Sequence, residues 1–426
     1  MSLDRPRLRP FIQSVEARLP GQEQPVYLLR DPLKMAPERQ VALPLPGLAL
    51  AALMDGTRTL DELVAEFERR HGARPDREQA EALRDALDEA LLLESPALSE
   101  VLEAFRRDPV RAPACIGSYP GDPDQLRAFL DEQWTREGGP AGGPGQPGPR
   151  GPVRGIVSPH IDLHRGGHAY AHAWRAVAES CPAELFVIFG TSHTGTAPLD
   201  RDAGGRPPRF ALTRKDFHTP LGTVPTDREL VDRLVRAYRG PDDLFAGEVH
   251  HRHEHSIEFQ TVWLAHLFHG RRPLRILPVL CGAVNDVQGR ASRDEGLRAF
   301  HGALAEVLAA YRPEQVAFVA GIDLAHVGAQ FDAPPLDLPS LSAVEAQDRV
   351  TMDLVVRARD ADLVHDDIRR DGDPRSICGH APLVSLLLAL SGERLDGELL
   401  HYGRWYDGQS AVSFASAVLS AGGDPR

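Results

Sequence analysis

Four segments of this chain place a side chain that can bind a metal at one end of an apolar stretch. Within SPHIDLHRGG a short strand leads to His160, and FVIFGTSH leads to His193. VAFVAGIDLAH leads to Asp323 and His326, and in SICGHAPLVSLLLAL an apolar helix follows Cys378. Because the carboxyl ends of parallel strands lie along one edge of an open α/β sheet, side chains distant in sequence can meet there. The pattern therefore predicts an α/β fold with one shared site at that edge.

Apolar runs and amphipathic stretches alternate from residue 153 onward. This alternation predicts strands at 155–158, 185–189, 274–280, 316–320 and 411–419, and helices at 168–179, 257–268, 297–310 and 344–358. Strands separated by helices are typical of a parallel sheet. We therefore expect a mainly parallel sheet with flanking helices over residues 112–426, interrupted by a loop rich in glycine and proline at 138–152.

The first hundred residues predict a separate α+β module, joined to the rest by a linker at 101–111. Thr59 and Glu62 form a capping-box pattern at the start of an amphipathic helix, and a second amphipathic helix follows. The order resembles that of winged-helix modules and of PqqD-like domains, which hold peptides for radical-SAM enzymes. That resemblance implies that an edge strand near 26–29 accepts an extended peptide by strand addition. The alternative role is capping or dimerisation.

The motifs of the larger part occur in the order found in one protein family. The strand that ends at His160, the GTSH turn, the segment DLAH and the helix start CGHAP follow this order in the Memo family. SYPGDPDQLRAFLDEQW at 118–134 is similar to the opening of that family, and HEHSIEFQ at 253–260 to its middle motif. From Ala112 to its end the chain thus resembles the Memo family, in particular the bacterial members called AmmeMemoRadiSam system protein B.

The resemblance implies a fold similar to that of class III extradiol dioxygenases, which are non-haem iron enzymes. Carried over position by position, it makes His160, His193 and Cys378 the metal ligands. Two imidazoles and one thiolate suit iron, copper or zinc, and we expect iron or copper rather than zinc. Many non-haem oxygenases use two histidines and one carboxylate. Either the thiolate tunes the metal, or Asp323 or Asp162 takes the carboxylate position and the cysteine stands aside.

The resemblance also places Asp323, His326 and His255 around the ligands as catalytic residues. His326 is the best general-base candidate, because the pKa of an imidazole lies near neutral pH; its alternative role is to orient a ligand. Within HHRHEH, only His255 is expected to point inward. Since a helix is predicted to begin near Pro382, its positive end should favour the thiolate form of Cys378.

Composition excludes several classes of function. The formal charge of −13 argues against broad nucleic-acid binding, which requires a basic face. The most hydrophobic run, LVSLLLAL, is too short to span a bilayer, and the amino terminus lacks an apolar signal core. The 4 cysteines show no CxxC pattern, so we expect neither a disulfide framework nor a zinc ribbon, and a reducing cytoplasm as the setting.

Two classes of function remain open at the level of sequence. One is a non-haem, metal-dependent redox or dioxygenase-like enzyme that works with a radical-SAM system. The other is a non-catalytic, metal-binding adaptor or peptide-binding scaffold for a radical-SAM partner. The resemblance implies radical-SAM and AMMECR1-like proteins as partners, and a peptide at the amino-terminal module, but neither nucleic acid nor a membrane.

Overall fold

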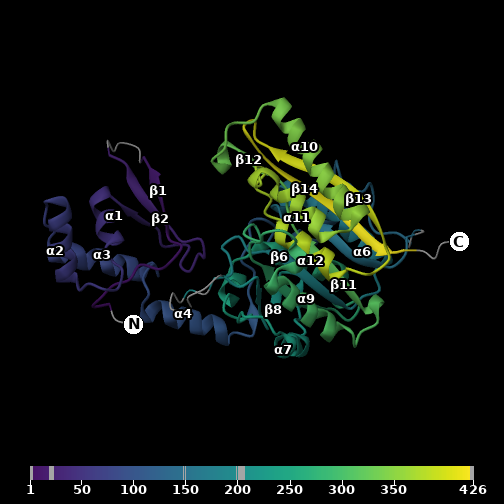
Figure 1. Ribbon diagram of the computed structural model, residues 1–426, viewed down its shortest axis with the longest axis horizontal. Coiled ribbons are helices and arrows are strands. Elements are labelled where there is room, and N and C mark those ends of the chain that lie inside the picture. The colour runs from purple at the N-terminus through teal and green to yellow at the C-terminus, as the bar shows by residue number, and fades with distance from the viewer. Residues whose placement is uncertain are drawn as a thin grey trace. The chain divides into compact units, whose positions relative to one another are not determined.

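The chain folds into two compact units (Figure 1). The computed structural model describes residues 3–18, 24–146, 148, 150–197, 199 and 207–422. One unit comprises Met1–Asp108 and Pro198–Gly205, and the other comprises Pro109–Ala197 and Arg206–Arg426. Among the described residues, none of the helices is both long enough and apolar enough to cross a lipid bilayer.

The first unit packs a small antiparallel sheet against helices. Its strands lie in the order β1 (Gln13–Ala17), β2 (Val26–Arg30) and β3 (Val41–Leu43). The helices that follow are α1 (Leu45–Ala52), α2 (Leu60–His71), α3 (Arg77–Glu89) and α4 (Pro96–Arg107). The predicted capping box is present: the Thr59 hydroxyl accepts a hydrogen bond from the Glu62 amide, and the Glu62 carboxylate accepts one from the Thr59 amide.

Strand β2 is the central strand of this sheet, whereas the sequence analysis placed an edge strand at 26–29. It pairs with β1 on one side and with β3 on the other, so its main-chain groups are already used. The outer strands of this sheet are β1 and β3, and Val15 of β1 is 46% exposed. The segment predicted as a linker, 101–111, forms the second half of α4 and strand β4 (Val110–Arg111), which pairs with β8 (Asp216–Thr219).

The second unit is built on an 8-stranded sheet. Its centre consists of four parallel strands in the order β5 (Val153–Ser158), β11 (Val316–Gly321), β6 (Leu185–Thr191) and β10 (Arg275–Cys281). The flanking strands are antiparallel to their neighbours: β7 (Phe210–Leu212), β12 (His326–Gly328), β13 (Leu395–Tyr406) and β14 (Ser410–Ala421). The α/β class is therefore confirmed, but the sheet is mixed and not mainly parallel.

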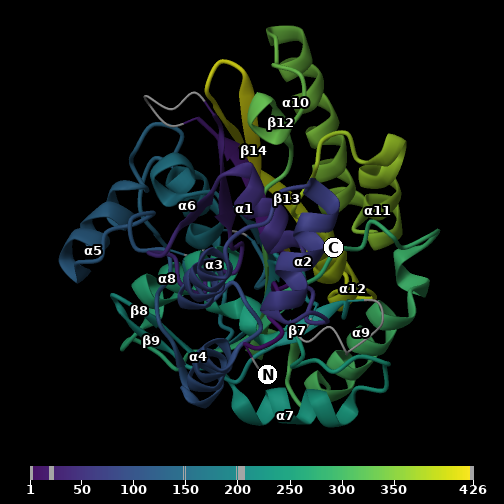
Figure 2. The ribbon, with the colours of Figure 1, turned by 90° about the vertical axis from the view of Figure 1, so that its left-hand side faces the viewer.

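The departure from a parallel sheet has a local cause. The long strands β13 and β14 form an antiparallel hairpin, yellow in Figure 1 and Figure 2, and β14 continues this direction along β5. A hairpin needs only a short turn, whereas a parallel connection needs a crossover segment. The second unit also contains a smaller sheet, whose strands lie in the order β4, β8 and β9 (Gly222–Val224).

Alternate residues of the central strand β6 enter two separate cores, as a pleated strand requires. In β6, Val187 and Phe189 join one apolar cluster, while Phe186 and Ile188 join the other. The first cluster includes residues of α7 (Arg228–Ala237), α9 (Glu295–Leu308), α11 (Ala361–Arg369) and α12 (His380–Ala389). The second includes residues of α5 (Pro123–Glu132), α6 (Leu163–Ser180) and α8 (His255–Phe268). Helices thus cover both faces of the sheet.

The remaining helical segments are α10 (Leu338–Asp353), a π-helical turn at Leu354–Ala358, and 3-10 turns at Glu248–Arg252, Ala291–Arg293, Pro313–Gln315, Ala329–Phe331 and Arg370–Gly372. The described residues of the stretch rich in glycine and proline, 138–152, form no helix or strand, as predicted. This stretch is held against α6, because the Gly145 amide donates to Glu179 and the Arg175 guanidinium donates to the Pro140 carbonyl.

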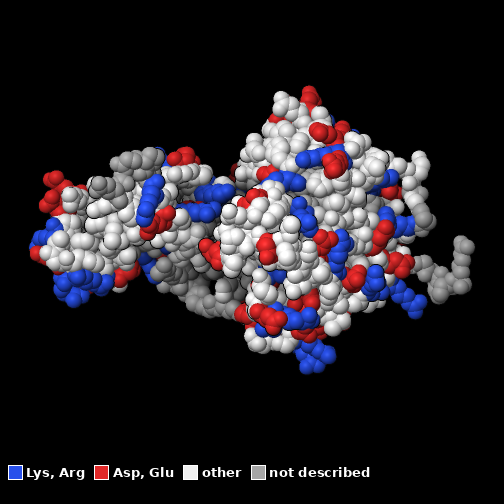
Figure 3. All heavy atoms as spheres, turned by 90° about the horizontal axis from the view of Figure 1, so that it is seen from above, with Lys and Arg blue, Asp and Glu red and all other residues white. Residues whose placement is uncertain are grey.

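Charged side chains are mixed on the face drawn in Figure 3, where basic and acidic groups are interspersed. Some charged side chains of the chain are paired within one helix, as Arg69 and Arg70 are with Glu66. All 4 cysteines are free, in agreement with the expectation that the chain has no disulfide framework.

Candidate metal centre

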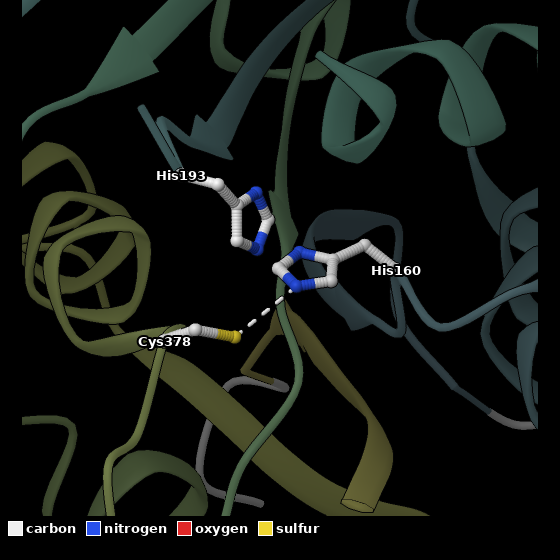
Figure 4. Close-up of side chains that lie close together, drawn as sticks. All are labelled: His160, His193 and Cys378. Atoms are coloured by element: carbon white, nitrogen blue, oxygen red, sulfur yellow. Dashed lines mark hydrogen bonds between the residues drawn. The ribbon is translucent and has the colours of Figure 1, made fainter. Parts of the chain in front are cut away.

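The strand-end residues converge at the carboxyl edge of the sheet. His160 follows β5, His193 follows β6, and Cys378 lies just before α12. One ligand atom from each lies within 4.8 Å of the other two, and Figure 4 shows the three side chains facing one another. A second group, formed by His193, Glu254 and His255, meets the same limit. The sequence pattern therefore located side chains that do come together in space.

His160 is buried and held in one orientation. Its Nδ1 lies 3.0 Å from the Gly321 carbonyl oxygen, which can only accept, so Nδ1 carries the proton. Burial, with His193 and His255 nearby, holds the pKa of His160 well below its ordinary value, so the ring is neutral. Its Nε2 lone pair then faces the Cys378 Sγ at 3.1 Å. This is the arrangement of a histidine that is ready to bind a metal through Nε2.

His193 is oriented by a buried carboxylate, Glu254. The His193 Nδ1 lies 3.0 Å from the Glu254 Oε1, and the His193 amide donates to the other carboxylate oxygen at 3.0 Å. Burial alone lowers the pKa of His193, but the Glu254 charge and a hydrogen bond with Cys378 outweigh it and hold that pKa well above its ordinary value. The proton on Nε2 is therefore the one that a bound cation would replace.

Glu254 also begins helix α8. Its Oε1 accepts hydrogen bonds from the amides of His255 at 2.8 Å and Ser256 at 3.0 Å. Burial raises the pKa of Glu254, but the charges of His193 and His255 and these hydrogen bonds hold it well below its ordinary value. Because its oxygens are engaged by these donors, we assign Glu254 the role of orienting His193 and not that of a ligand.

Cys378 lies in the turn before α12. Burial raises the pKa of its thiol, and the hydrogen bond with His193 opposes that rise without cancelling it. The expected stabilisation of the thiolate by the helix start is therefore not the dominant effect, and α12 begins at His380, earlier than predicted. A thiol here loses its proton when a metal binds, which couples metal affinity to pH.

Two glycines allow the elements around the centre to approach closely. A Cβ on Gly321, at the end of β11, would lie 2.6 Å from the Ser256 carbonyl oxygen of α8. A Cβ on Gly379 would lie 2.5 Å from the Ile322 Cβ. Any side chain at these positions would push α8 or the Cys378 turn away from the strand ends.

Arg111, near the start of the second unit, contacts helix α8 and the turn before it. The buried Arg111 guanidinium donates to the His251 carbonyl at 2.9 Å and to the Glu254 carbonyl at 2.8 Å. It also pairs with the buried Glu258 carboxylate, which accepts from the Tyr119 hydroxyl and from amides of the same opening segment. The main chain that carries Glu254 is thus bound to β4.

The Asp323 carboxyl group contacts both the main chain and the ring of His160. Its Oδ1 accepts a hydrogen bond from the His160 amide at 3.1 Å, and its Oδ2 lies 3.7 Å from the His160 Nε2. Burial raises the pKa of Asp323 to about 7, although hydrogen bonds and the charge of His193 oppose this rise. A carboxyl group with such a pKa can hold or release a proton near neutral pH. Asp162, the other carboxylate considered, instead caps α6 by accepting from the His164 amide at 2.8 Å.

The structure places His255 and His326 differently. The ring of His255 stacks on that of His193 at a centroid distance of 4.6 Å and contacts that of His160 at 5.2 Å. His326 lies on β12, with its Nδ1 3.1 Å from the Leu324 carbonyl oxygen and its ring against Phe331. Burial lowers the pKa of His326 to about 4, which makes its imidazole a weak base. Its role as general base stays a prediction, and Asp323 fits a proton-transfer role better.

The donor set fits a transition metal. Two imidazole nitrogens and one sulfur are ligands that iron, copper and zinc accept, and the remaining ring nitrogen of each histidine is held by an acceptor. Glu254 was not predicted from the sequence, because the imidazoles of HHRHEH are the more obvious metal ligands in this segment. The available signal was its position immediately before the predicted helix, where a carboxylate can accept from the first amides.

Comparison with known proteins identifies relatives over most of the chain. The family model described as Memo-like protein matches residues 111–418. A MEMO1 family protein of Aquifex aeolicus is 26% identical over 401 residues, which cover 92% of this chain and 96% of that protein. One from Methanopyrus kandleri is 28% identical over 294 residues (68% and 91%), and one from Thermus thermophilus is 30% identical over 289 residues (66% and 76%). The Aquifex alignment must extend into the first unit, because it covers nearly the whole chain.

Proposed function

The chain belongs to the Memo family, and from that premise we propose that it binds one redox-capable transition-metal ion, iron or copper, through His160, His193 and Cys378. We propose further that it is a non-haem, metal-dependent enzyme of the dioxygenase-like kind. The single observation that carries the proposal is the convergence of three ligand atoms within 4.8 Å of one another. The acceptors on the opposite ring nitrogens support it, because they fix both imidazoles with Nε2 directed at the cysteine.

The residues around the ligands supply what such an enzyme needs from its protein. When bound, the metal would provide redox chemistry that no side chain can provide by itself. Asp323 would hold or accept a proton beside His160, since burial brings its pKa to about 7. About a third of the His193 and His255 side chains is exposed, so the centre is open to solvent on the side of α8. A substrate would enter from that side.

Metal analysis of protein purified without an affinity tag tests the ligand assignment. Wild-type protein should carry about one metal ion per chain, and Cys378→Ala and His160→Ala should each lose most of it, because two ligands hold a metal far more weakly than three. Cys115→Ala is the matched control: Cys115 is also partly buried and free, but it lies outside both groups of ligand atoms. Equal metal content in all four proteins would overturn the proposal.

Absorption spectra sharpen the test of the cysteine. Copper bound by a thiolate gives a charge-transfer band, and this band should appear when the protein is titrated with copper and be absent in Cys378→Ala. If Cys378→Ala keeps its metal while an Asp323→Ala variant loses it, the carboxylate alternative is the correct one, and Cys378 stands beside the metal.

The second candidate function is a metal-binding adaptor for radical-SAM and AMMECR1-like partners. One observation favours it: the first unit contains an exposed edge strand, β1, to which a partner peptide could add as a further strand. Oxygen consumption by iron-loaded protein with catechols and small phenolics distinguishes the two functions. Turnover that Asp323→Asn diminishes supports the enzyme. No turnover across the panel, together with partner capture that removal of residues 1–108 abolishes, supports the adaptor.

A further inference from the structure

A cleft opens at the other end of the central sheet from the metal centre. It has a volume of about 600 Å³ and lies between α9, the turn after it, the start of β11 and the end of α12. Figure 1 shows α9 and α12 next to each other, and α12 runs from the Cys378 turn to this cleft. The volume is within the range of small-molecule sites and too small for a folded partner.

The floor of the cleft is apolar. Side chains from three elements line it: Leu297, Leu304, Leu308, Phe318 and Leu388. Of these, Leu297, Leu304 and Phe318 are buried, so they form a fixed surface that belongs to the core of the unit. Such a floor favours binding of the hydrocarbon part of a ligand, because apolar surface of both is removed from water.

One polar side chain in this lining, that of His301, has ring nitrogens without a partner. Both ring nitrogens of His301 are buried, and neither has a hydrogen-bond partner within the described part of the chain. Its ring is surrounded by Phe189, Phe210 and Phe300. Burial lowers the pKa of His301 to about 3, so the ring is neutral and offers one donor and one acceptor. A buried polar group left without a partner costs free energy, and both nitrogens lie below the surface of the cleft.

The rim of the cleft carries positive charge that the protein does not neutralise. Arg298 and Arg312 are exposed, and neither forms an ion pair within the described residues. Arg298 precedes His301 by three residues on α9, so both lie on one side of the helix. By contrast, Arg154 in the same cleft is buried and forms a bidentate pair with Glu393, with both contacts at 2.8 Å. The available charge is therefore at the rim.

A glycine keeps the mouth of the cleft open. Gly302 lies in the interior of α9, where glycine weakens a helix relative to alanine. A Cβ built on Gly302 would meet no other atom within 4 Å, so no packing constraint explains its lack of a side chain. A large residue at this position would extend into open space at the cleft.

From these observations we infer that the cleft binds a small organic carboxylate with an apolar body. The hydrocarbon part lies on the leucine floor, and the carboxylate pairs with the guanidinium groups of Arg298 and Arg312. This site is separate from the proposed metal centre, and its occupancy does not depend on the metal.

Calorimetric titration of the full chain with phenylbutyrate tests the inference, with phenylbutanol as the uncharged analogue. We expect saturable binding of the acid, and weaker binding of the alcohol by about tenfold, because the alcohol lacks the charge-assisted bonds. The double variant Arg298→Gln/Arg312→Gln should weaken the acid by about tenfold and leave the alcohol nearly unchanged. Arg236→Gln is the control, since Arg236 is exposed and lies outside the cleft.

A filling variant tests the location of the site. Gly302→Phe should abolish binding of both compounds while its metal content and melting temperature stay close to those of the wild type. Undiminished binding in Gly302→Phe would overturn the location. Equal affinity for acid and alcohol, or no saturable binding of either by the wild type, would overturn the ligand class. Loss of metal in Cys378→Ala or His160→Ala should leave these binding results unchanged. The proposal of a metal centre and that of a carboxylate site can therefore be refuted independently.

Discussion

The histidines at the two ends of the central sheet differ in the hydrogen-bond partners of their ring nitrogens. At the carboxyl end, the Nδ1 of His160 and that of His193 are held by the Gly321 carbonyl and the Glu254 carboxylate, which leaves one nitrogen of each ring for a ligand. At the amino end, neither nitrogen of His301 has a partner among the described residues. The comparison teaches that an acceptor on one ring nitrogen fixes the orientation of an imidazole, whereas apolar neighbours leave both nitrogens of a buried ring without a polar contact.

If the positions of the side chains at the carboxyl end depend on the contacts of Arg111 with α8, removing these contacts should strongly lower the free energy of unfolding. Arg111→Met leaves the buried Glu258 carboxylate without its charged partner and should lower the free energy of unfolding by about 3–5 kcal/mol. Urea denaturation measures this change. The control Arg127→Met removes an exposed ion pair with Asp124 and should cost at most about 1 kcal/mol. Equal effects of the two variants would show that α8 needs no anchor.

The same pair should make stability depend on pH. Burial raises the pKa of Glu258, but Arg111 and the hydrogen bonds from Tyr119 and Ala114 outweigh it and hold that pKa below its ordinary value of 4.5. The stabilisation is therefore fully present above pH 4.5 and is lost as pH falls through the folded-state pKa. Unfolding free energies of wild type and Glu258→Gln should differ most near neutral pH and converge in acid. A difference that stays constant down to pH 3 contradicts the assignment.

The orienting role of Glu254 predicts a smaller effect, confined to the metal. Glu254→Gln keeps the size of the side chain but removes the charge that fixes the His193 tautomer, and metal affinity should fall by about 10- to 100-fold. Competition with a chelator measures this affinity. Because Glu254 also caps α8, Asp122→Asn, which alters the cap of α5, is the control and should bind metal as the wild type does. A full loss of metal in Glu254→Gln would instead make this carboxylate a ligand.

The smallest expected effect concerns the amino end. Gly302→Ala should raise the free energy of unfolding by about 0.5–1 kcal/mol, because alanine favours the interior of α9 and its Cβ meets no neighbour. Thermal denaturation measures the gain. The substitution adds only one methyl group, so binding of phenylbutyrate should change little. A destabilised Gly302→Ala would show that this glycine is required by the fold and does not serve to leave the cleft open.

The central strands and their terminal histidines could be predicted because each depends on local sequence. An apolar run that ends in His160 or His193 predicts both a strand and the edge at which the side chain emerges. Among the flanking strands, β14 was predicted, but β7 and β12 could not be: they have three residues each, too few to show a period, and their partners lie far away in sequence. The direction of β14 depends on β13, which was not predicted.

The limits of the site prediction have a related cause. Residue type identified the imidazoles and the thiol, but the pKa of each group depends on burial and on neighbours from other elements. His326 and Asp323 illustrate this. Burial lowers the pKa of the His326 imidazole to about 4 and raises the pKa of the Asp323 carboxyl group to about 7. The carboxyl group, and not the imidazole, therefore titrates near neutral pH. Glu254 was overlooked because its partner, His193, is remote in sequence and becomes its neighbour only when β6 and α8 pack together.

The order of strands in the sheet has a consequence for how the protein folds. Strand β14 pairs with β5, the first strand of the main sheet, so segments far apart in sequence must meet before the sheet is complete. Cys378 lies between these two strands in sequence and comes near His160 only through such distant contacts. We therefore expect the second unit to fold slowly, because the entropy of closing a long loop is lost before the contacts that compensate for it are made.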